Sequence, residues 1–436
     1  MHQHITIKDQ KIFIEGCDAL TLAQTYKTPL YVLSETTIRE KFREIRTQFL
    51  EKHPNTIAAY ASKAFLTTAF VKIVAQEGFH MDVVSGGELF TALNAQFPME
   101  RIIFHGNNKS KEELEMAVLN KVGRIVVDNT HELEVLASIA KAHQIEMNIL
   151  FRITPGVNSS THDYIATGKK DSKFGISLDD FVIMPAIETA IKAPFLNFLG
   201  FHFHVGSQIF DHTSHVVATQ IALDLIKRVK ADYNYDITEL NTGGGFGIKY
   251  TDTCTPQSIG YFTDAIVDTI DQYCMANHLV RPKICIEPGR FIVGEAGTTL
   301  YTVGSVKDIK DLKTYVAVDG GMTDNIRPAL YQAKYTALLA NKPLDPAAGE
   351  VTLCGKCCES GDLLVEHLPL PKATSGDVVA VFSTGAYNYS MASHYNKHVV
   401  PAVVLVSGAN AYEIVERETY EDLVRHDVIP PHLNQI

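Results

Sequence analysis

The sequence TELNTGGGFG at residues 238–247 closes a short strand-like run with a cluster of glycines. A longer segment, YFTDAIVDTIDQYCMAN at 261–277, follows it and carries apolar residues at spacings of three and four, which predicts an amphipathic helix. The chain then returns to a second short run, ICIE at 284–287. A strand, a helix and a second strand in this order form the repeating unit of α/β folds.

This alternation of short apolar runs and helical segments extends from about residue 36 to residue 290. The strand-like runs are 56–61, 81–84, 102–105, 124–127, 148–154, 199–204, 238–241 and 284–287. The helical segments include 112–119, 132–143, 181–191, 214–230 and 261–277. Eight strand–helix pairs in about 250 residues match a TIM barrel in number and length, so we expect an α/β fold with a (β/α)8 barrel here.

The pattern of predicted elements changes after residue 290, where strand-like runs no longer alternate with helical segments. Strand-like runs at 315–318, 350–353, 377–382 and 402–406 follow one another, separated by glycine, proline and aspartate, which is typical of an all-β domain. The first 35 residues also contain strand-like runs, and we expect them to join that domain because chain ends often lie close together. The predicted organisation is a barrel domain over 36–290 and a C-terminal β domain, sandwich or barrel-like, built from 1–35 and 291–436.

Composition excludes several classes of partner. Hydrophobic residues make up 46% of the 436 residues, and 39 Lys and Arg against 50 Asp and Glu give a net charge of −11. An acidic chain offers no general basic field, so neither nucleic acid nor an anionic membrane is expected to bind. Seven scattered cysteines, no readable secretory signal and no apolar run long enough to span a membrane predict a cytoplasmic protein.

Polar residues and glycines lie at or just after the ends of six of the eight runs, where a barrel places its reaction site. These residues are Lys63, Asp82, His105, His202, His204, Ser207, Gly243, Gly244, Gly245, Glu287, Gly289 and Arg290. The glycine cluster follows the seventh run, where barrels often bind phosphate because bare backbone amides can approach its oxygens. A tight structural turn is the alternative interpretation of these glycines.

Lys63 lies in AAYASKAF at 58–65, a setting of apolar and small residues. Desolvation there would lower the pKa of the amine and make it a better nucleophile toward a carbonyl, whereas the alternative is an exposed loop lysine. A phosphate site together with a desolvated lysine suggests pyridoxal phosphate held as a Schiff base. Glu287 would then face the pyridine nitrogen and keep it protonated.

Two sets of residues suggest a metal instead. His202 and His204 alternate on one strand and could both point into the barrel mouth as ligands, but ring stacking or a hydrogen bond is favoured because no third ligand stands at a telling spacing. Cys354, Cys357 and Cys358 in CGKCCES suggest zinc, yet no second Cys or His pair at zinc-finger spacing follows. We therefore expect no metal.

Ordered motifs occur along almost the whole chain. They are YASKA at 60–64, MDVVSGGEL at 81–89, HGNNKS at 105–110, THDYIATG at 161–168, SKFGI at 172–176, GFHFHVGSQI at 200–209, NTGGGFGIKY at 241–250, EPGRFIV at 287–293, DGGMTDNIRPALY at 319–331, CGKCCESGDLL at 354–364 and GAYNYSMASHYN at 385–396. This set resembles the diaminopimelate decarboxylases, pyridoxal-phosphate enzymes with an alanine-racemase-like barrel. The resemblance implies decarboxylation of meso-2,6-diaminopimelate to L-lysine and carbon dioxide, the last step of lysine biosynthesis.

The resemblance also implies roles at the cofactor. Lys63 would hold pyridoxal phosphate as a Schiff base, His202 would stack on the pyridine ring, and Glu287 would pair with the ring nitrogen. Asp82 would support the lysine side of the pocket. The residues around the phosphate would be Ser207, Gly243, Gly244, Gly245, Gly289, Arg290 and Tyr387.

Substrate contacts follow from the same resemblance. The substrate-binding residues would be Arg290, Arg327, Tyr331, Glu359 and Tyr387. Arginine suits the far carboxylate because its planar guanidinium can donate two parallel hydrogen bonds, and Glu359 would meet the distal ammonium. Cys358 would protonate the carbanion, and in the family it comes with Glu359 from the partner subunit, which implies a homodimer with shared active sites.

Two positions depart from the family pattern. Lys356 stands where the family usually has the proline of CGP, and NKHVVP at 396–401 lacks the usual Arg-Pro after YN. The first could alter the loop that bears Cys358, while the second lies past the residues named above in the sequence.

Other functions on the same fold stay open. One is decarboxylation of ornithine, arginine or carboxynorspermidine, and another, from a different class, is a noncatalytic pyridoxal-phosphate-binding protein. Arg327 in RPALY favours a substrate with a distal carboxylate. Glu287 speaks against a racemase, because racemases of this type typically have an arginine at the pyridine nitrogen. A noncatalytic relative would be shorter and would lack the β domain.

Overall fold

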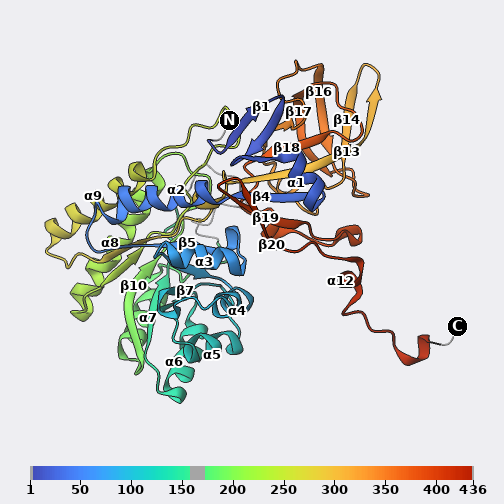
Figure 1. The fold of residues 1–436 in the computed structure, drawn as a ribbon. Coiled ribbons are helices and arrows are strands. Elements are labelled where there is room, and N and C mark those ends of the chain that lie inside the picture. The colour runs from blue at the N-terminus through green and yellow to red at the C-terminus, as the bar shows by residue number, and fades with distance from the viewer. Residues whose placement is uncertain (1–2, 158–171, 435–436) are drawn as a thin grey trace. The chain divides into compact units, whose positions relative to one another are not determined.

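The computed structural model describes residues 3–157 and 172–434, and Figure 1 shows its ribbon. The chain forms two compact units, a barrel unit over Ile38–Gly294 and a β unit that combines Met1–Thr37 with Glu295–Ile436. The motif THDYIATG at 161–168, which contributes to the family resemblance, lies outside the described residues.

Eight parallel strands, counted over the described residues, close the barrel. In barrel order they are β5 (Thr56–Ala61), β6 (His80–Val83), β7 (Ile102–Phe104), β8 (Arg124–Val127), β9 (Met147–Arg152), β10 (Leu196–His202), β11 (Glu239–Asn241) and β12 (Lys283–Ile286). Strand β12 pairs in parallel with β5, which completes the ring. The predicted (β/α)8 barrel is confirmed.

Small and branched apolar side chains fill the interior of the barrel. Ala59, Ile103, Val126, Leu150 and Cys285 form one buried cluster, and they come from β5, β7, β8, β9 and β12. Packed side-chain layers of this kind are usual in TIM barrels. The barrel is therefore a solid core, and its chemistry is left to the carboxyl ends of the strands.

Helices alternate with the strands of this unit (Figure 1). They are α2 (Glu35–Ile45), α3 (Thr68–Gln76), α4 (Gly86–Asn94), α5 (Lys111–Leu119), α6 (Thr130–His143), α7 (Asp180–Lys192), α8 (Thr213–Tyr233), α9 (Ile259–Asn277) and α10 (Arg290–Val293), with the short helices η1 (Arg46–Leu50), η2 (Ser62–Ala64) and η3 (Met99–Arg101). Local sequence sets the helix starts. Ser110 and Glu113 form a capping box at α5, and Asn129 caps α6.

The β unit contains two sheets in its described part. The smaller is antiparallel and consists of β1 (Ile5–Lys8), β2 (Lys11–Ile14) and β3 (Cys17–Asp18). The larger contains β4 (Leu30–Ser34), β13 (Gly297–Ile309), β14 (Lys313–Val318), β15 (Ala337–Leu339), β16 (Gly349–Cys354), β17 (Leu363–Leu370), β18 (Val378–Phe382), β19 (Ala402–Ser407) and β20 (Asn410–Val415). Strand β4 pairs with both β13 and β19, so the two ends of the chain share one sheet, as predicted.

Short helices also occur in the β unit, which the all-β expectation did not include. They are α1 (Ala19–Tyr26), α11 (Arg327–Tyr331), α12 (Tyr420–Val424), η5 (Tyr389–Met391), η6 (Tyr395–Lys397) and η7 (Pro431–Leu433). Helix α1 begins where the side chain of Asp18 accepts a hydrogen bond from the amide of Leu20. Its Leu22 and Ala23 are buried in the same cluster as Ile12 of the small sheet. Tertiary packing therefore stabilises a helix between two strand-like runs.

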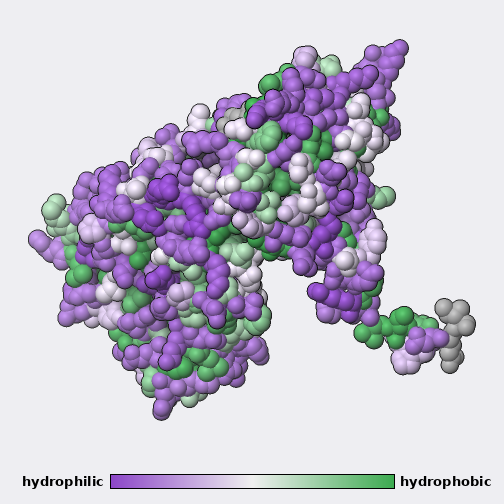
Figure 2. Space-filling view, viewed as in Figure 1, coloured by the Kyte–Doolittle hydropathy of each residue, from purple (hydrophilic) through white to green (hydrophobic). Residues whose placement is uncertain are grey.

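The surface visible in Figure 2 is largely hydrophilic. A hydrophobic stretch appears on the C-terminal segment beyond β20, where Val428 and Ile429 are exposed. Over residues 3–157 and 172–434, no helix has the length and apolar composition needed to cross a membrane.

Candidate active site

The predicted cofactor residues of the barrel unit lie at or just beyond the carboxyl ends of its strands. Lys63 lies on η2 after β5, Asp82 lies near the end of β6, and His202 is the last residue of β10. The turn 243–245 follows β11, and Glu287 follows β12. Because the carboxyl ends of parallel strands meet at one mouth of a barrel, the fold brings these residues together.

The buried carboxylate of Glu287 is the centre of this arrangement. Its Oε1 accepts hydrogen bonds from Nε2 of His105 and Nδ2 of Asn241, both at 2.7 Å. Its Oε2 lies 3.2 Å from Nε2 of His202. Burial raises the pKa of Glu287, but the two histidines outweigh that effect and hold the pKa well below its ordinary value. Glu287 is therefore ionised.

Both imidazoles that face Glu287 are neutral. Burial lowers the pKa of His202 to about 3 and also lowers the pKa of His105, although Glu287 opposes the shift in both cases. Among the described residues, Nδ1 of His202 has no hydrogen-bond partner. Neutral donors leave a full negative charge on the buried carboxylate, so a cationic group such as a protonated pyridine nitrogen fits against it.

Lys63 differs from its prediction in one respect. Its side chain is exposed between the buried residues Ser62 and Ala64, so the expected desolvation is wrong. On the one-turn helix η2, the side chains of Ser62 and Ala64 are packed in the interior while that of Lys63 is not. Burial raises the pKa of Asp82 well above its ordinary value, Glu287 adds to the shift, and Lys63 opposes it. The amine of Lys63 therefore acts on the site without being buried.

The glycine turn after β11 is fixed by close packing. Gly245 adopts a φ of 102°, which favours glycine, and a Cβ on Gly244 would collide with the carbonyl oxygen of Glu287. The amide of Gly244 donates to Nδ1 of His204 at 3.3 Å, and Nε2 of His215 on α8 donates to the Gly244 carbonyl at 2.9 Å. The turn thus has the bare backbone that the phosphate hypothesis requires.

Arg290 and Ser207 lie together beside this turn. Nη2 of Arg290 donates to Oγ of Ser207 at 2.9 Å, and Nη1 donates to the Tyr250 hydroxyl at 2.5 Å. Gly289 precedes Arg290 at the start of α10, where a Cβ would come within 2.8 Å of the Ala61 side chain. A buried guanidinium, a hydroxyl and bare backbone are together suited to an anionic group.

The metal hypothesis takes a different form in the structure. One ligand atom each of His105, His202 and Glu287 lies within 4.8 Å of the others. The sequence instead paired His202 with His204, whose Nδ1 accepts the Gly244 amide. The residues that could hold a metal ion are therefore Glu287 itself and the two histidines that contact its carboxylate.

Three predicted residues of the β unit lie on or near α11 and the 383–388 segment. Arg327 begins α11, is buried, and donates from Nη1 to the Tyr335 hydroxyl at 2.6 Å. Tyr331 ends the same helix and is half-buried. Tyr387 is half-buried and adopts a φ of 63°, an unusual backbone conformation for tyrosine.

Cys358 and Glu359 lie on the loop after β16, and both are exposed. Asp362 is buried. Its carboxylate accepts a hydrogen bond from the backbone amide of Cys357 at 2.8 Å and another from the backbone amide of Met322, in the DGGMTDN segment, at 2.6 Å. Oδ1 of Asn396 accepts the Cys358 amide at 2.8 Å. Two side chains from different segments therefore fix the backbone that carries Cys358.

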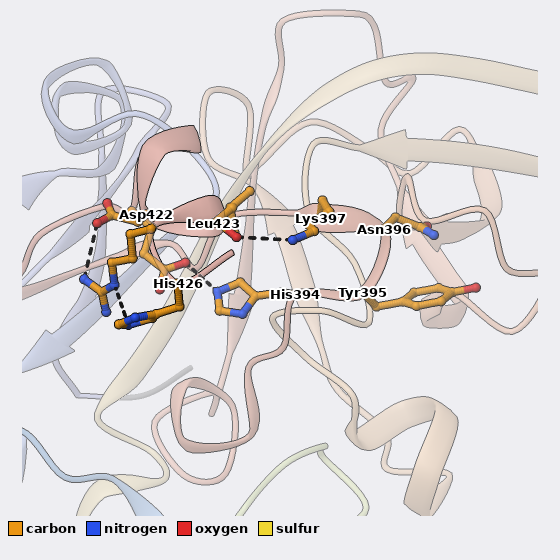
Figure 3. Close-up of a pocket in the computed structure, with 9 residues that line it drawn as sticks. His394, Tyr395, Asn396, Lys397, Asp422, Leu423 and His426 are labelled. Atoms are coloured by element: carbon orange, nitrogen blue, oxygen red, sulfur yellow. Dashed lines mark hydrogen bonds and ion pairs between the residues drawn. The ribbon is translucent and has the colours of Figure 1, made fainter. Parts of the chain in front are cut away.

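A hollow of about 490 Å³ lies beside Asn396 in the β unit (Figure 3). It is lined by residues 394–397 and by the C-terminal segment 418–426, and Nζ of Lys397 donates to the Leu423 carbonyl at 3.2 Å. In Figure 3, Asn396 points away from the C-terminal segment. The departure NKHVVP lies past Cys358 in sequence, yet it begins at a residue that holds the Cys358 loop.

Sequence reasoning missed several of these contacts. Asn241, His215 and Tyr250 received no role, and His105 was placed at a strand end without a partner. Two of them carried a readable signal, because His105 and Asn241 are polar residues that directly follow or end apolar barrel runs. Their common partner, Glu287, is distant in sequence and could not be read from spacing.

Comparisons with known proteins agree with this geometry. The family model described as "Pyridoxal-dependent decarboxylase, pyridoxal binding domain" matches residues 35–294. Diaminopimelate decarboxylase of Bacillus methanolicus is 49% identical over 96% of this chain and 98% of its own length, and that of Bacillus subtilis (strain 168) is 48% identical over 95% and 94%. The crystal structure of diaminopimelate decarboxylase from M. jannaschii in complex with L-lysine matches with a TM-score of 0.92, at 36% identity over 99% of both chains.

Proposed function

The chain belongs to the pyridoxal-dependent decarboxylase family, and from this premise we propose that its barrel mouth binds pyridoxal phosphate and decarboxylates meso-2,6-diaminopimelate. The products are L-lysine and carbon dioxide. The single observation that carries the proposal is the ionised Glu287, buried among neutral donors. A buried negative charge without a cation is costly, and a protonated pyridine nitrogen would offset that cost.

Pyridoxal phosphate supplies, when bound, an electron sink for the bond that breaks at Cα of the substrate. Lys63 would hold its carbonyl carbon, and the exposed position of the amine leaves it accessible to the cofactor and the substrate. Asp82 would act on the Lys63 side of the pocket. His202 would pack against the ring, and Glu287 would keep the ring nitrogen protonated.

Phosphate would bind at the glycine turn 243–245, with Ser207, Gly289 and Arg290 beside it. The close approach that these glycines allow supports this role, because backbone amides can reach phosphate oxygens where no side chain intervenes. Tyr387 of the β unit is assigned to the same group on the family resemblance.

The β unit would supply the substrate contacts. Arg327 and Tyr331, together with Arg290, would hold the carboxylate that is retained, and Glu359 would meet the distal ammonium. Sγ of Cys358 would return a proton to Cα after carbon dioxide leaves. The exposure of Cys358 supports this role, since a proton donor must reach the reacting atom.

The functional assembly would be a homodimer in the cytoplasm, with Cys358 and Glu359 entering the partner's site. Exposed apolar residues on the C-terminal segment support a protein–protein contact there. All seven cysteines carry free thiols, which supports a reducing compartment. Light scattering of the purified protein tests the assembly, and a monomer at micromolar concentration would contradict it.

Carbon dioxide release tests the substrate. We expect release from meso-diaminopimelate that depends on pyridoxal phosphate, and far less from ornithine, arginine or lysine measured in parallel. A preference for one of those three would overturn the substrate. Cofactor binding without release from any of them would favour a noncatalytic pyridoxal-phosphate protein.

Borohydride reduction followed by peptide mapping tests the cofactor residue separately. Reduction makes a lysine–cofactor bond permanent, and we expect the label on Lys63. Label on another lysine would refute the role of Lys63, whatever the substrate proves to be.

A further inference from the structure

His105 forms a hydrogen bond with the carboxylate of Glu287, although the two residues are far apart in the barrel sequence. It follows β7, is buried, and places Nε2 2.7 Å from Oε1 of Glu287. We propose that His105 is a positioning residue that fixes the carboxylate of Glu287 through a hydrogen bond to Oε1 and turns its second oxygen toward the cofactor. This inference rests on the proposed pyridoxal-phosphate site.

The two oxygens of Glu287 have different surroundings. Oε1 accepts two short hydrogen bonds, from His105 and from Asn241 at the end of β11. Oε2 has the longer contact of 3.2 Å with His202, the residue assigned to pack on the pyridine ring. Two donors on Oε1 fix the plane of the carboxylate, so Oε2 becomes the oxygen available to a ring nitrogen.

The ring of His105 is itself fixed. Its backbone amide donates to the Val83 carbonyl at 2.7 Å, which ties the end of β7 to β6. Its imidazole packs edge-on against His202, with ring centroids 4.6 Å apart and planes at 67°. A donor that cannot rotate away gives Glu287 one orientation before the cofactor arrives, which removes an ordering cost from binding.

The charge state of His105 matters as much as its position. A protonated His105 would pair with Glu287 and neutralise the charge that the pyridine nitrogen needs. Burial lowers the pKa of His105, so the ring donates while uncharged. The hydrogen bond then stabilises the carboxylate without cancelling its charge.

Other charged and titratable groups also act on this carboxylate. They are His202 at the end of β10, His204 two residues beyond it, Arg152 of β9, Asp82 of β6 and Cys285 of β12. These side chains are the same in every His105 variant. A shift in the titration of the site that occurs with alanine but not with glutamine at position 105 can therefore be assigned to the hydrogen bond that His105 donates.

The test compares His105→Ala with His105→Gln in the holoenzyme. The amide nitrogen of glutamine can occupy a position close to that of Nε2, whereas alanine donates nothing. We expect the alanine variant to release cofactor on dilution at a dissociation constant raised by ~10-fold or more. We also expect the acid limb of its kcat profile to move to higher pH, because Glu287 loses a donor that lowers its pKa. Glutamine should restore most of both properties.

A surface pair provides the matched control. Nε2 of His143 lies 2.8 Å from Oε1 of Glu115, with both side chains partly exposed, and His143→Ala should leave the cofactor dissociation constant and the pH profile unchanged. Thermal unfolding of all variants is measured alongside. Wild-type cofactor affinity and an unshifted acid limb in the alanine variant would overturn the proposal, and so would equal defects in the alanine and glutamine variants.

Failure of the proposed function gives a different result. It would appear in the wild-type protein as no bound pyridoxal phosphate, or as reductive label away from Lys63. If the wild type carries the cofactor on Lys63, and His105→Ala has the same cofactor affinity and pH profile as the wild type, only the proposed role of His105 is refuted.

Discussion

Glu287 concentrates the chemistry of this barrel in one side chain. Its carboxylate is buried, ionised and surrounded by an amide and two uncharged imidazoles. A residue with that environment is poised to pair with a cation, and the charge is the property that a conservative change can remove while keeping the shape.

Glu287→Gln should lower kcat by at least ~100-fold, because a neutral amide cannot keep the pyridine nitrogen protonated. Steady-state kinetics with meso-diaminopimelate measures the effect, and Glu287→Ala should be at least as impaired. Glu115→Gln, which removes the charge from an exposed Glu–His pair, serves as the control and should retain full turnover. Near wild-type turnover in Glu287→Gln would contradict the assignment.

Single residues show which features of the site could be predicted from the sequence and which could not. The positions of Lys63, His202 and Glu287 at strand ends could be predicted, because a parallel barrel exposes the residues that directly follow its strands. The exposure of Lys63 could not, since apolar neighbours in sequence do not reveal which way a one-turn helix presents its side chain. The contact of His105 with Glu287 joins residues 182 apart in the chain, a distance that no spacing rule covers.

The contact between α8 and the glycine turn depends on one buried histidine. His215 donates from Nε2 to the Gly244 carbonyl at 2.9 Å and stacks on Phe246 with ring centroids 5.4 Å apart. Burial lowers its pKa from 6.5 to about 4, although the hydrogen bond to Gly244 opposes the shift. In the unfolded chain this histidine binds a proton below about pH 6.5, whereas in the folded protein it does so only near pH 4.

Between these pH values the unfolded state binds more protons, so the free energy of unfolding falls as pH is lowered from 6.5 to 4. One such group contributes about 1.4 kcal/mol per pH unit within the window. His215→Gln keeps a donor for Gly244 but does not titrate, so its denaturant-unfolding free energy should fall less steeply over the same range. Equal slopes for variant and wild type would show that His215 is not responsible.

The loop that carries Cys358 depends on Asn396. The Cys358 amide donates to Oδ1 of Asn396, whose φ of 53° is a conformation that asparagine and glycine tolerate. Asn396→Gly removes the acceptor without backbone strain, and we expect kcat to fall by ~10-fold because the proton donor loses its position. Asn396→Asp keeps the acceptor oxygen and should retain most activity. Cofactor affinity should be unchanged in both variants. Equal kcat values for Asn396→Gly and the wild type would contradict the role of Asn396 in positioning Cys358.

Elements differ in how well the sequence predicts them. The barrel strands could be read because parallel strands buried on both faces appear as short apolar runs, and the predicted run 124–127 coincides with β8. Helix α1 was missed because Ala19–Tyr26 lies among strand-like runs, and its stability comes from packing Leu22 and Ala23 into the core of the β unit. The local sequence does not indicate against which sheet this helix packs.

The whole molecule combines a barrel unit and a β unit, and the proposed reaction needs residues from both. Lys63 and Glu287 belong to the barrel unit, while Arg327 and Cys358 belong to the β unit. A homodimer with shared sites would take the first pair from one subunit and Cys358 from the other. This arrangement makes each site dependent on two chains, which activity measurements on mixed subunits can detect.

Lys63→Ala and Cys358→Ala subunits, each strongly impaired alone, should restore activity when they pair. In a mixed dimer one site contains both substitutions and the other contains neither, so random pairing should yield about one quarter of the wild-type activity. Co-expression with two different tags and sequential purification isolates the mixed dimers, whose activity should rise to about one half. Pairing Lys63→Ala with a Lys63→Ala, Cys358→Ala double variant is the control, because no arrangement of those chains contains an intact site. If isolated mixed dimers stay as inactive as that control, each site is built within one chain, and the exposed Cys358 acts on its own barrel.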